Sequence, residues 1–251
     1  MAKSLTGATA LITGAAKRIG RAIALMLATE GVNIVVHYNH SDDEAEELRR
    51  ELTDLGVKSW AVRADFAQPA EYASLLDRAL EMADSLDILV NNASIFPQEK
   101  LDEMTLASLH LNIEVNAWVP FQLSRDFAQK LGTGSIVNLI DSRTRGYDWN
   151  HTGYILSKHV LAVMTRMLAL KYAPGVTVNG IAPGLILPPP GEDQSYLDKL
   201  VHLVPLKRHG DAQDIADAAL YLLKSDFLTG EVIYVDGGRH LLEYIGGQPP
   251  R

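Results

Sequence analysis

The segment ATALITGAAKRIG, residues 8–20, carries the pattern from which the rest of the chain can be interpreted. Residues 8–12 form a short apolar run typical of a buried strand, and apolar residues recur at helical spacing over 19–27. Gly14 and Gly20 lie in the turn between these elements. Glycine there lets the backbone approach a pyrophosphate at the N-terminus of the following helix, so the segment predicts the first half of a phosphate-binding βαβ unit.

Two features of this turn depart from the common dinucleotide-binding pattern. The glycines do not follow the G-x-G-x-x-G spacing, and Arg18 stands where a middle glycine is usual. Taken alone, the turn is compatible both with a nucleotide site and with an ordinary connection between a strand and a helix. The choice between them depends on the remainder of the chain.

The composition is that of one large α/β domain. The chain has 251 residues, of which 47% are hydrophobic and 22% are charged, so it can bury a substantial core. A net charge of -8 disfavours a nucleic-acid surface, and the lack of cysteine excludes disulfides, thiol catalysis and thiolate metal sites. Neither a signal-peptide pattern nor a membrane-spanning apolar run is present, so we expect a cytoplasmic protein without membrane contact.

Short β-branched runs alternate with longer helical patterns. This alternation predicts a single Rossmann-type α/β domain over residues 1–251, with about seven parallel strands in a doubly wound sheet and helices on both faces. The expected strands are residues 8–12, 33–37, 58–63, 86–90, 135–140, 176–181 and 231–235. The expected helices include residues 41–56, 102–109, 112–130, 154–172 and 211–224.

Local signals refine these elements. Ser41 and Glu44 match a capping box at the start of a charged helix, and Pro120 predicts a kink or break in the helix that contains it. Proline and glycine are frequent over 183–191, which we expect to be mobile and to begin a substrate loop over 183–200. Residues 241–251 are expected to form a C-terminal tail.

The polar and glycine-rich segments all follow predicted strands. They comprise residues 13–20, 37–41, 65–66, 91–96, 141 and 183–187. Ligands of open parallel sheets bind beyond the carboxyl ends of the strands, so these segments should gather along one edge. This convergence favours a nucleotide site at the first turn.

Tyr154 and Lys158 lie four residues apart on one face of a predicted helix. An ammonium beside a phenol lowers the pKa of the phenol, which makes the tyrosine a better proton donor or acceptor near neutral pH. Asp141, at the end of a predicted strand, can reach the same place, and Asn116 is polar among apolar neighbours. By themselves, the Tyr–Lys pair also suits a solvated helix face and Asn116 a buried structural amide.

Together these motifs resemble the short-chain dehydrogenases/reductases over about residues 5–240. The residues that carry the resemblance are Thr13-Gly14, Gly20, Asn91-Asn92-Ala93, Asn116, Tyr154-x-x-x-Lys158 and Pro183-Gly184. The resemblance implies a nicotinamide cofactor, with Tyr154 as proton donor, Lys158 holding the nicotinamide ribose and Asn116 supporting a proton relay. It also implies a homotetramer.

Two departures from the general family pattern indicate one branch of the family. Asp141 replaces the usual catalytic serine, and Arg18 replaces the middle glycine. Both changes occur together in the pteridine reductases and the dihydromonapterin reductases. The chain also resembles this branch at residues 13–20, His37-Tyr38 with Ser41, Asn92-Ala93-Ser94 with Phe96, and 236–240. The resemblance therefore implies a pterin substrate.

The chemistry of a pterin agrees with this resemblance. A pterin is a flat, electron-poor bicycle that stacks well between an aromatic ring and a nicotinamide, and we expect Phe96 to be that ring, although it also suits packing on the core. Asp141 and Tyr154 are expected to share the proton that accompanies hydride transfer. The expected substrate contacts are Arg18, Ser94, Phe96, Asp141, Tyr154 and Leu187.

The charges after the second predicted strand favour NADPH over NADH. NAD sites usually place an acid there to hold the ribose 2′-hydroxyl, and this chain has none before Asp42. Hydroxyls, imidazoles and cations suit a 2′-phosphate instead. The expected cofactor contacts are Gly14, Lys17, Arg18, Ile19, Gly20, His37, Tyr38, Asn39, His40, Ser41, Asp65, Phe66, Asn92, Ala93, Ser94, Tyr154, Lys158, Pro183, Gly184 and Leu185.

Three functions remain open from the sequence. The favoured one is NADPH-dependent reduction of a dihydropterin, such as dihydrobiopterin or dihydromonapterin, to the tetrahydropterin. A carbonyl reductase acting on 3-oxoacyl groups or small ketones would keep the same fold. A non-enzymatic NADP-binding regulator is disfavoured by the intact Tyr154, Lys158 and Asn116. No metal site is expected, because the histidines at 151, 159 and 202 lack ligand spacing.

Overall fold

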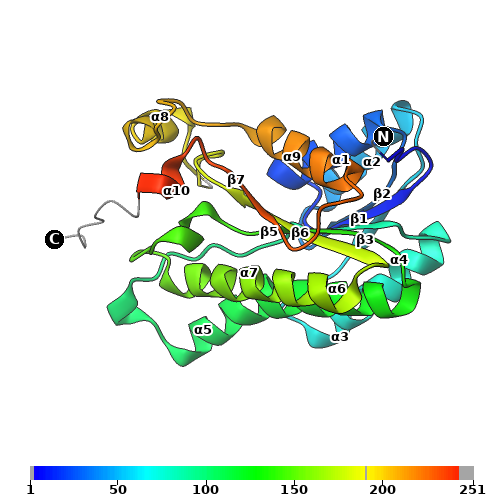
Figure 1. Ribbon diagram of the computed structural model, residues 1–251, viewed down its shortest axis with the longest axis horizontal. Coiled ribbons are helices and arrows are strands. Elements are labelled where there is room, and N and C mark those ends of the chain that lie inside the picture. The colour runs from blue at the N-terminus through cyan, green and yellow to red at the C-terminus, as the bar shows by residue number, and fades with distance from the viewer. Residues whose placement is uncertain (1–2, 190, 243–251) are drawn as a thin grey trace.

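The computed structural model describes residues 3–189 and 191–242. Within this part of the chain, seven strands form one sheet in the order β3-β2-β1-β4-β5-β6-β7, with every neighbouring pair parallel (Figure 1). The strands are β1 (Thr9–Ile12), β2 (Asn33–Tyr38), β3 (Ser59–Arg63), β4 (Ile88–Asn91), β5 (Gly134–Leu139), β6 (Val176–Pro183) and β7 (Val232–Val235). The predicted doubly wound parallel sheet is confirmed.

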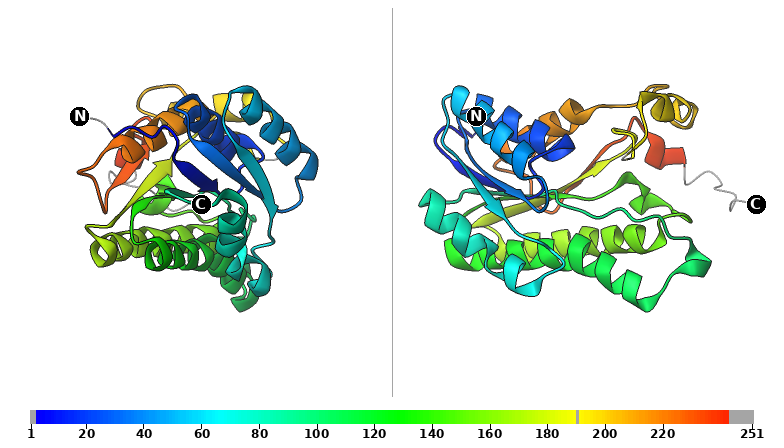
Figure 2. Two further views of the ribbon diagram at one scale, coloured as in Figure 1. Left: turned by 90° about the vertical axis from the view of Figure 1, so that its right-hand side faces the viewer. Right: turned by 180° about the vertical axis from the view of Figure 1, so that it is seen from behind.

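Helices cover both faces of the sheet (Figure 2). The helices against one face are α1 (Arg18–Thr29), α2 (Asp42–Asp54) and α9 (Ala212–Lys224). Those against the other are α3 (Pro69–Ala73), α4 (Leu75–Ala83), α6 (Val119–Leu131) and α7 (Thr152–Tyr172). Between residues 3 and 242, no helix described is long and apolar enough to cross a membrane.

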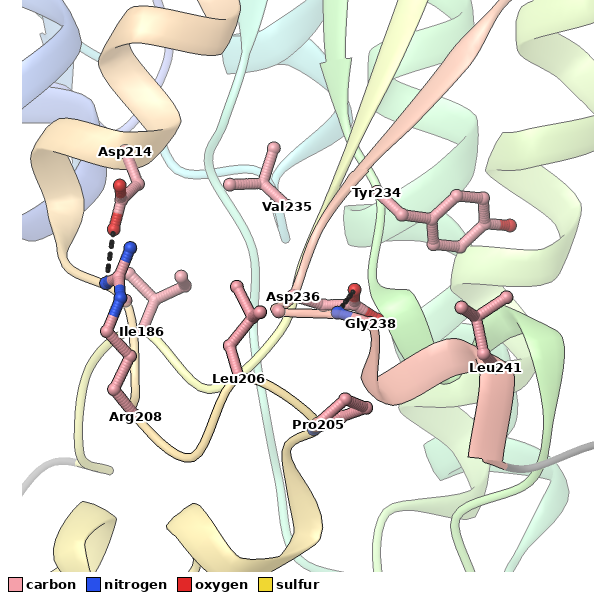
Figure 3. A pocket seen from close by; sticks show the side chains of 12 residues that line it. Ile186, Pro205, Leu206, Arg208, Asp214, Tyr234, Val235, Asp236, Gly238 and Leu241 are labelled. Carbon is pink, nitrogen blue, oxygen red and sulfur yellow. Dashed lines mark hydrogen bonds and ion pairs between the residues drawn. The ribbon is translucent and has the colours of Figure 1, made fainter.

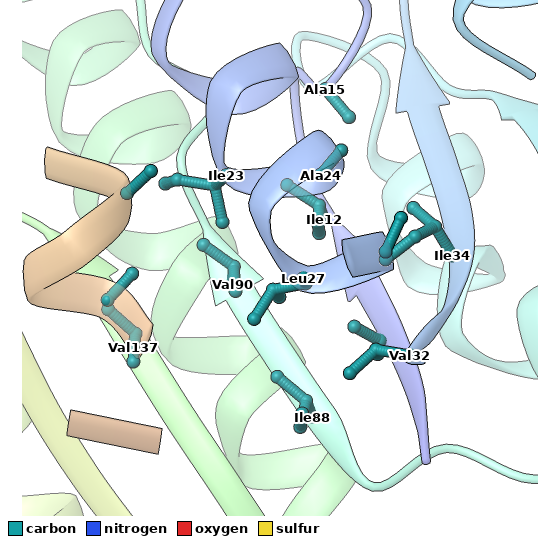
Figure 4. Packing of buried hydrophobic residues seen from close by; sticks show 14 of the residues in the cluster. Ile12, Ala15, Ile23, Ala24, Leu27, Val32, Ile34, Ile88, Val90 and Val137 are labelled. Carbon is teal, nitrogen blue, oxygen red and sulfur yellow. The ribbon is translucent and has the colours of Figure 1, made fainter. Parts of the chain in front are cut away.

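The central strands are apolar on both sides because each side packs on a helical layer. Ile12 of β1 belongs to the core under α1, whereas Leu11, which points the opposite way, belongs to the core on the other face. Ile23 and Leu27 of α1 pack over this centre beside Val90 of β4 (Figure 4). The strand order changes direction between β1 and β4, so the ends of these strands form the switch point at which ligands of such sheets bind.

The helices between β4 and β5 differ from the prediction of a helix at 102–109 and a second at 112–130. A short 3₁₀ turn, η1 (Leu101–Glu103), is followed by one continuous helical run made of α5 (Leu106–Ile113), η2 (Glu114–Trp118) and α6. Pro120 does not break this run, since it is the second residue of α6. The preceding segment η2 is a π-helical turn, which accommodates the proline's missing N–H.

The capping box predicted for α2 is wrong. Ser41 precedes the helix, but its side chain makes no capping hydrogen bond. Glu44 instead forms an ion pair with Lys17, with 2.5 Å between Oε1 and Nζ. The lysine from the neighbouring turn draws the carboxylate away from the helix N-terminus, where it would have completed the box.

The sequence predicted a mobile loop over 183–191. In the structure, the first part of this segment is held by buried contacts. Leu185 and Ile186 are buried, and Leu185 packs with Leu197 of α8 (Gln194–Asp198). The first part of the predicted substrate loop is therefore fixed by apolar contacts. Of the predicted tail, residues 241 and 242 end α10 (Arg239–Leu242), and residues 243–251 lie outside the described residues.

The end of β2 supports the turn after β1 through a buried imidazole. His37 is 2% exposed, its Nδ1 accepts a hydrogen bond of 3.0 Å from the Gly14 N–H, and its Nε2 lies 3.0 Å from the Ala64 carbonyl oxygen. The ring stacks on Phe66 with 4.6 Å between centroids. Burial lowers the pKa of His37 to about 4, so the ring is neutral at pH 7 and Nε2 carries its proton.

We expect His37 to make the free energy of unfolding fall in mild acid. Its folded pKa of about 4 lies below the ordinary 6.5, so as pH falls the unfolded chain takes up the proton first. The contribution is complete above pH 6.5 and is lost progressively down to pH 4, with a loss of about 2 kcal/mol at pH 5. Urea unfolding at pH 7 and pH 5 measures this loss in the wild type and in His37→Gln. The wild type should lose about 2 kcal/mol more than the variant, and equal losses would contradict this role.

Candidate active site

The turn after β1 is fastened to the end of β4. The Thr13 Oγ1 accepts hydrogen bonds from the N–H groups of Asn92 (2.9 Å) and Ala93 (3.0 Å). In return, the Asn92 Nδ2 donates to the carbonyl oxygens of Thr13 (2.9 Å) and Gly14 (3.0 Å). Asn92, Ala93 and Gly14 were predicted as cofactor contacts, whereas the fastening role of Thr13 was missed. The structure brings these residues together at the switch point.

Gly20 has no room for a side chain. A Cβ at this position would lie 2.3 Å from the Gly14 carbonyl oxygen and 2.6 Å from the Asn92 Nδ2. Gly14 itself has φ +61°, in the left-handed region that glycine adopts most readily. The two glycines singled out in the sequence therefore allow the close packing of this turn against Asn92.

Arg18 adopts a glycine-like backbone conformation at the start of α1. Its φ is +57°, which is unfavourable for a residue with a side chain. Its guanidinium donates a hydrogen bond of 2.7 Å to the Pro188 carbonyl oxygen. Arg18 thus stands where a glycine is usual and connects the first turn to the loop after β6.

A hollow of about 270 Å³ lies between the turn after β1 and the end of β2. It is lined by Gly14, Ala16, Lys17, Tyr38, Asn39, His40 and Ser41. Of the two imidazoles predicted near the cofactor, His40 lines this hollow and His37 does not. The expectation that His37 offers its ring to a phosphate is wrong, because the ring is buried, neutral and hydrogen-bonded within the protein.

Asn116 occupies the π-helical turn η2 and is fully buried. Its Oδ1 accepts hydrogen bonds from the Ile95 N–H (2.9 Å) and the Ser94 hydroxyl (3.1 Å). Its Nδ2 donates to the Ser157 hydroxyl on α7 at 3.1 Å. The side chain therefore holds the loop after β4 against α7, as the structural alternative for Asn116 anticipated. Its participation in a proton relay stays a prediction.

Tyr154, Asp141 and Phe96 come from three separate segments and meet at one place. The Tyr154 hydroxyl donates a hydrogen bond of 3.0 Å to the Asp141 Oδ2. The Phe96 ring lies edge-on to the Tyr154 ring, with 4.6 Å between centroids. Tyr154 belongs to the first turn of α7, and Asp141 lies two residues after the end of β5 and caps the 3₁₀ turn η3 (Ser142–Arg145). A phenol hydroxyl, a carboxylate and an aromatic ring thus form one cluster.

Lys158 is hydrogen-bonded to the end of β5 and lies over the Tyr154 ring. Its Nζ donates to the Leu139 carbonyl oxygen at 2.7 Å and lies 5.6 Å from the centroid of the Tyr154 ring. Burial lowers the pKa of Lys158 to about 8. Burial and the Asp141 charge raise the pKa of Tyr154 well above its ordinary value. The predicted lowering of the tyrosine pKa is therefore wrong for this arrangement, in which the hydroxyl meets a carboxylate and the ammonium lies over the ring.

Arg143 is a charged member of the cluster that the sequence analysis missed. Its Nε and Nη2 donate to the two carboxylate oxygens of Asp141 at 2.9 and 2.7 Å, and its Nη1 pairs with Asp148. Burial would raise the pKa of the Asp141 carboxyl, but the charge and hydrogen bonds of Arg143 outweigh burial and lower it. Asp141 is therefore an anion. The signal in the sequence is an arginine two residues after a carboxylate that ends a strand.

His151 is a second missed residue, and it covers part of Phe96. The two rings stack with 4.0 Å between centroids and 11° between planes. The His151 Nδ1 lies 3.0 Å from the Asp148 Oδ2. Burial would raise the pKa of Asp148, but hydrogen bonding to His151 and the charge of Arg143 lower it to about 2. Phe96 nevertheless remains 39% exposed, so part of its ring faces solvent beside Tyr154.

A larger cavity of about 540 Å³ lies beyond the ends of β6 and β7 (Figure 3). It is lined by Ile186, Pro205, Leu206, Arg208, Gly210, Asp214, Tyr234, Val235, Asp236, Gly237, Gly238 and Leu241. Arg145 of η3 donates to the hydroxyl of Tyr234, which lines this cavity, at 2.8 Å. The predicted substrate contact Leu187 packs on the core under α1 and lines neither cavity. Among residues 3–189 and 191–242, no group of three metal-ligating side chains is present.

Comparison with known proteins agrees with this geometry. A family model described as enoyl-(acyl carrier protein) reductase matches residues 14–240. The 3-oxoacyl-[acyl-carrier-protein] reductase FabG of Staphylococcus epidermidis is 32% identical over 241 residues, which cover 93% of this chain and 99% of that protein. Glucose 1-dehydrogenase 2 of Bacillus subtilis is 32% identical over 252 residues, which cover 96% of this chain and 98% of that protein.

Similarity to solved structures extends over the whole chain. The crystal structure of FolM alternative dihydrofolate reductase 1 from Brucella canis, complexed with NADP, has a TM-score of 0.90 and is 31% identical, covering 100% of this chain and 99% of that one. The corresponding protein from Brucella suis, also in complex with NADP, has the same TM-score and covers 98% of each chain. The chain belongs to the short-chain dehydrogenase/reductase family of NAD(P)-dependent oxidoreductases.

Proposed function

We propose that this protein reduces a dihydropterin to the tetrahydropterin with NADPH. The observation that carries the proposal is the ionised Asp141 carboxylate, which accepts the hydrogen bond of the Tyr154 hydroxyl at 3.0 Å. The general family pattern has a serine at this position. A serine hydroxyl donates a hydrogen bond to a substrate, whereas a carboxylate only accepts.

This difference separates a ketone from a pterin. When hydride reaches a ketone carbon, negative charge develops on the carbonyl oxygen and needs hydrogen-bond donors. The Asp141 carboxylate would repel that charge. A dihydropterin instead carries N–H groups on its ring system, which can donate to a carboxylate. The site therefore favours a nitrogen heterocycle as substrate over a ketone, whose reduction develops an oxyanion.

The aromatic surface supports the same substrate class. The exposed part of Phe96 lies beside the proton donor Tyr154, with their rings 4.6 Å apart. A flat heterocycle that stacks on this ring would keep its edge within reach of Tyr154. Arg18 and Ser94 stand at the cofactor side of the same edge of the sheet and are the other substrate contacts that we propose.

We assign the 2′-phosphate of NADPH to the hollow between the turn after β1 and the end of β2. The residues Lys17, His40 and Ser41, which line this hollow, suit a 2′-phosphate. The solved relatives from Brucella are complexes with NADP. When bound, this cofactor supplies the hydride.

The protein's own residues then handle the proton. Tyr154 donates the proton that the reduced C=N bond takes up, and its raised pKa keeps the hydroxyl protonated until that step. Asp141 orients the hydroxyl through their hydrogen bond. Lys158 offers an ammonium beneath the ring that can hold the cofactor ribose, and Asn116 fixes the loop that carries Ser94.

The homotetramer implied by the family resemblance also stays a proposal. Apolar side chains exposed on α5 and α7 support it, including Leu111, Val163, Met167 and Leu170.

We expect Gly20→Ala to weaken NADPH binding by about tenfold or more, equivalent to about 1.4 kcal/mol. The added methyl would push against the Gly14 carbonyl oxygen and the Asn92 amide and deform the turn. Titration of NADPH fluorescence measures the affinity, and thermal melting checks that the variant folds. Gly56→Ala serves as the control: its φ of +86° also strains the backbone of an alanine, but no atom lies near the new Cβ and the position is away from the turn. Equal affinities for the two variants would contradict the proposed cofactor site.

Tyr154→Phe and Asp141→Ala should each lower dihydropterin turnover by at least about 10²-fold, the lower end of general-acid contributions. The first change removes the proton donor, and the second removes the group that orients it. Tyr147→Phe, which removes a hydroxyl from a mostly exposed tyrosine near the site, should leave turnover close to that of the wild type. Near-full turnover by Tyr154→Phe would refute this mechanism.

A carbonyl reductase is the second candidate, and the 32% identity to the 3-oxoacyl reductase FabG favours it. NADPH oxidation with dihydrobiopterin, dihydromonapterin and an acetoacetyl thioester separates the two candidates. We expect turnover on a dihydropterin to exceed turnover on the thioester, and Asp141→Ser to shift the ratio toward the thioester by restoring a hydroxyl donor. A wild type that prefers the thioester would overturn the pterin assignment.

A further inference from the structure

We propose that Arg143 is a specificity-determining residue, which occupies Asp141 until a substrate with N–H donors displaces it onto Asp148. The inference deepens the proposed function and rests on it, because it concerns selection of the substrate at the same site. It starts from the Arg143 side chain, which neither the sequence motifs nor the proposed proton transfer uses.

Arg143 satisfies both oxygens of Asp141. Its Nε and Nη2 donate to Oδ1 and Oδ2 at 2.9 and 2.7 Å, and its backbone N–H donates to Oδ1 at 2.8 Å. A planar guanidinium matches a carboxylate in this two-pronged manner better than any other side chain does. A ring with N–H groups along its edge would use the same oxygens. The arginine and the proposed substrate therefore compete for one acceptor.

The guanidinium also lies next to the aromatic rings of the site. Its Cζ is 5.1 Å from the centroid of Phe96 and 5.5 Å from the centroid of Tyr154. Its side chain is only 20% exposed, so it fills space between residues that the substrate must contact. The Arg143 guanidinium thus lies beside the three groups that we propose as contacts of the heterocycle. They are the Phe96 ring, the Tyr154 hydroxyl and the Asp141 carboxylate.

Asp148 gives the displaced arginine a second partner. Its Oδ2 already pairs with the Arg143 Nη1 and lies 3.0 Å from the His151 Nδ1. Its Oδ1 accepts from the backbone N–H of Asn150 at 2.8 Å, which fixes the carboxylate in place. When Arg143 leaves Asp141, its charge is therefore not left unpaired. The exchange needs a change of one hydrogen-bonding partner and no large movement of the chain.

This exchange discriminates between substrates. A heterocycle with N–H donors replaces the hydrogen bonds that Asp141 loses when Arg143 is displaced. The number of hydrogen bonds to Asp141 therefore stays the same. The reacting carbonyl of a ketone or thioester has no hydrogen to donate. Displacement would then leave the buried Asp141 anion without the two hydrogen bonds of the guanidinium, with the Tyr154 hydroxyl and the Arg143 backbone N–H as its donors. Occupancy by Arg143 also reduces the apparent affinity of every ligand by the fraction of molecules in which the site is open.

Arg143→Met tests whether the arginine occupies Asp141. Methionine keeps much of the packing of the side chain and removes the guanidinium that donates to both carboxylate oxygens. The probe is guanidinium chloride at millimolar concentration, below the range that denatures. We expect guanidinium to bind Arg143→Met in calorimetry and to inhibit it competitively against dihydrobiopterin, with at least about tenfold weaker effects on the wild type. Arg145→Met, two residues along in the same turn, is the matched control and should respond like the wild type. A folded Arg143→Met that binds no guanidinium, or is activated by it, would overturn the proposal.

A second pair of measurements distinguishes displacement from a purely structural role. At mildly alkaline pH, where Asp141 stays ionised, Arg143→Met should lower KM for the dihydropterin by about tenfold with little change in kcat. Asp148→Asn should raise KM, because Arg143 then has only Asp141 to pair with. Loss of packing alone would not move the two KM values in opposite directions. An increase of KM in Arg143→Met would refute the proposal, since it would make the arginine a substrate ligand.

The binding measurement also separates this proposal from the proposed function. If neither dihydropterin is reduced but guanidinium binds Arg143→Met and not the double variant with Asp141→Asn, the pterin assignment fails and the occupancy of Asp141 is supported. If the dihydropterins are reduced but guanidinium does not bind, the proposed function stands and the role of Arg143 is refuted.

Discussion

The buried carboxylate of Asp141 is the group around which the candidate site is arranged. It accepts hydrogen bonds from the Tyr154 hydroxyl and from the guanidinium of Arg143, so one anion positions a phenol and a cation at once. Burying a carboxylate is unfavourable unless it is paired, and this requirement accounts for the position of Arg143. In the general family pattern a neutral hydroxyl occupies this position and needs no such partner. The arginine therefore follows physically from the aspartate.

The architecture could be predicted from the sequence because it rests on local patterns. Alternating apolar runs and helical periodicity located all seven strands, and the parallel sheet followed from their order. Details set by neighbouring segments could not be predicted this way. The capping box at Ser41 failed because Lys17 attracts Glu44, and Pro120 left the helix unbroken because a π-helical turn precedes it. Both outcomes depend on contacts that one segment alone does not reveal.

The candidate site was predictable in its members but not in its electrostatics. The sequence identified Tyr154, Asp141 and Phe96, and the structure brings them together. The lowered pKa predicted for Tyr154 rested on Lys158, four residues away in the helix. In the structure the Tyr154 hydroxyl instead donates to the Asp141 carboxylate, whose charge raises the pKa of Tyr154. Arg143 escaped notice because its role depends on how the 3₁₀ turn after β5 folds back on Asp141. Charges whose partners come from loops are the least accessible to sequence patterns.

The hydrogen bond between Arg18 and the Pro188 carbonyl joins residues 170 positions apart in the chain. The same turn is fastened at its other side by Asn92, which follows β4. Its final shape is therefore a long-range property of the fold, although its two glycines lie within seven consecutive residues. Closing such distant loops costs chain entropy before the contacts repay it. During synthesis, this turn acquires its complete set of contacts only after roughly three-quarters of the chain is available, so the candidate nucleotide site is among the last parts of the molecule to be completed.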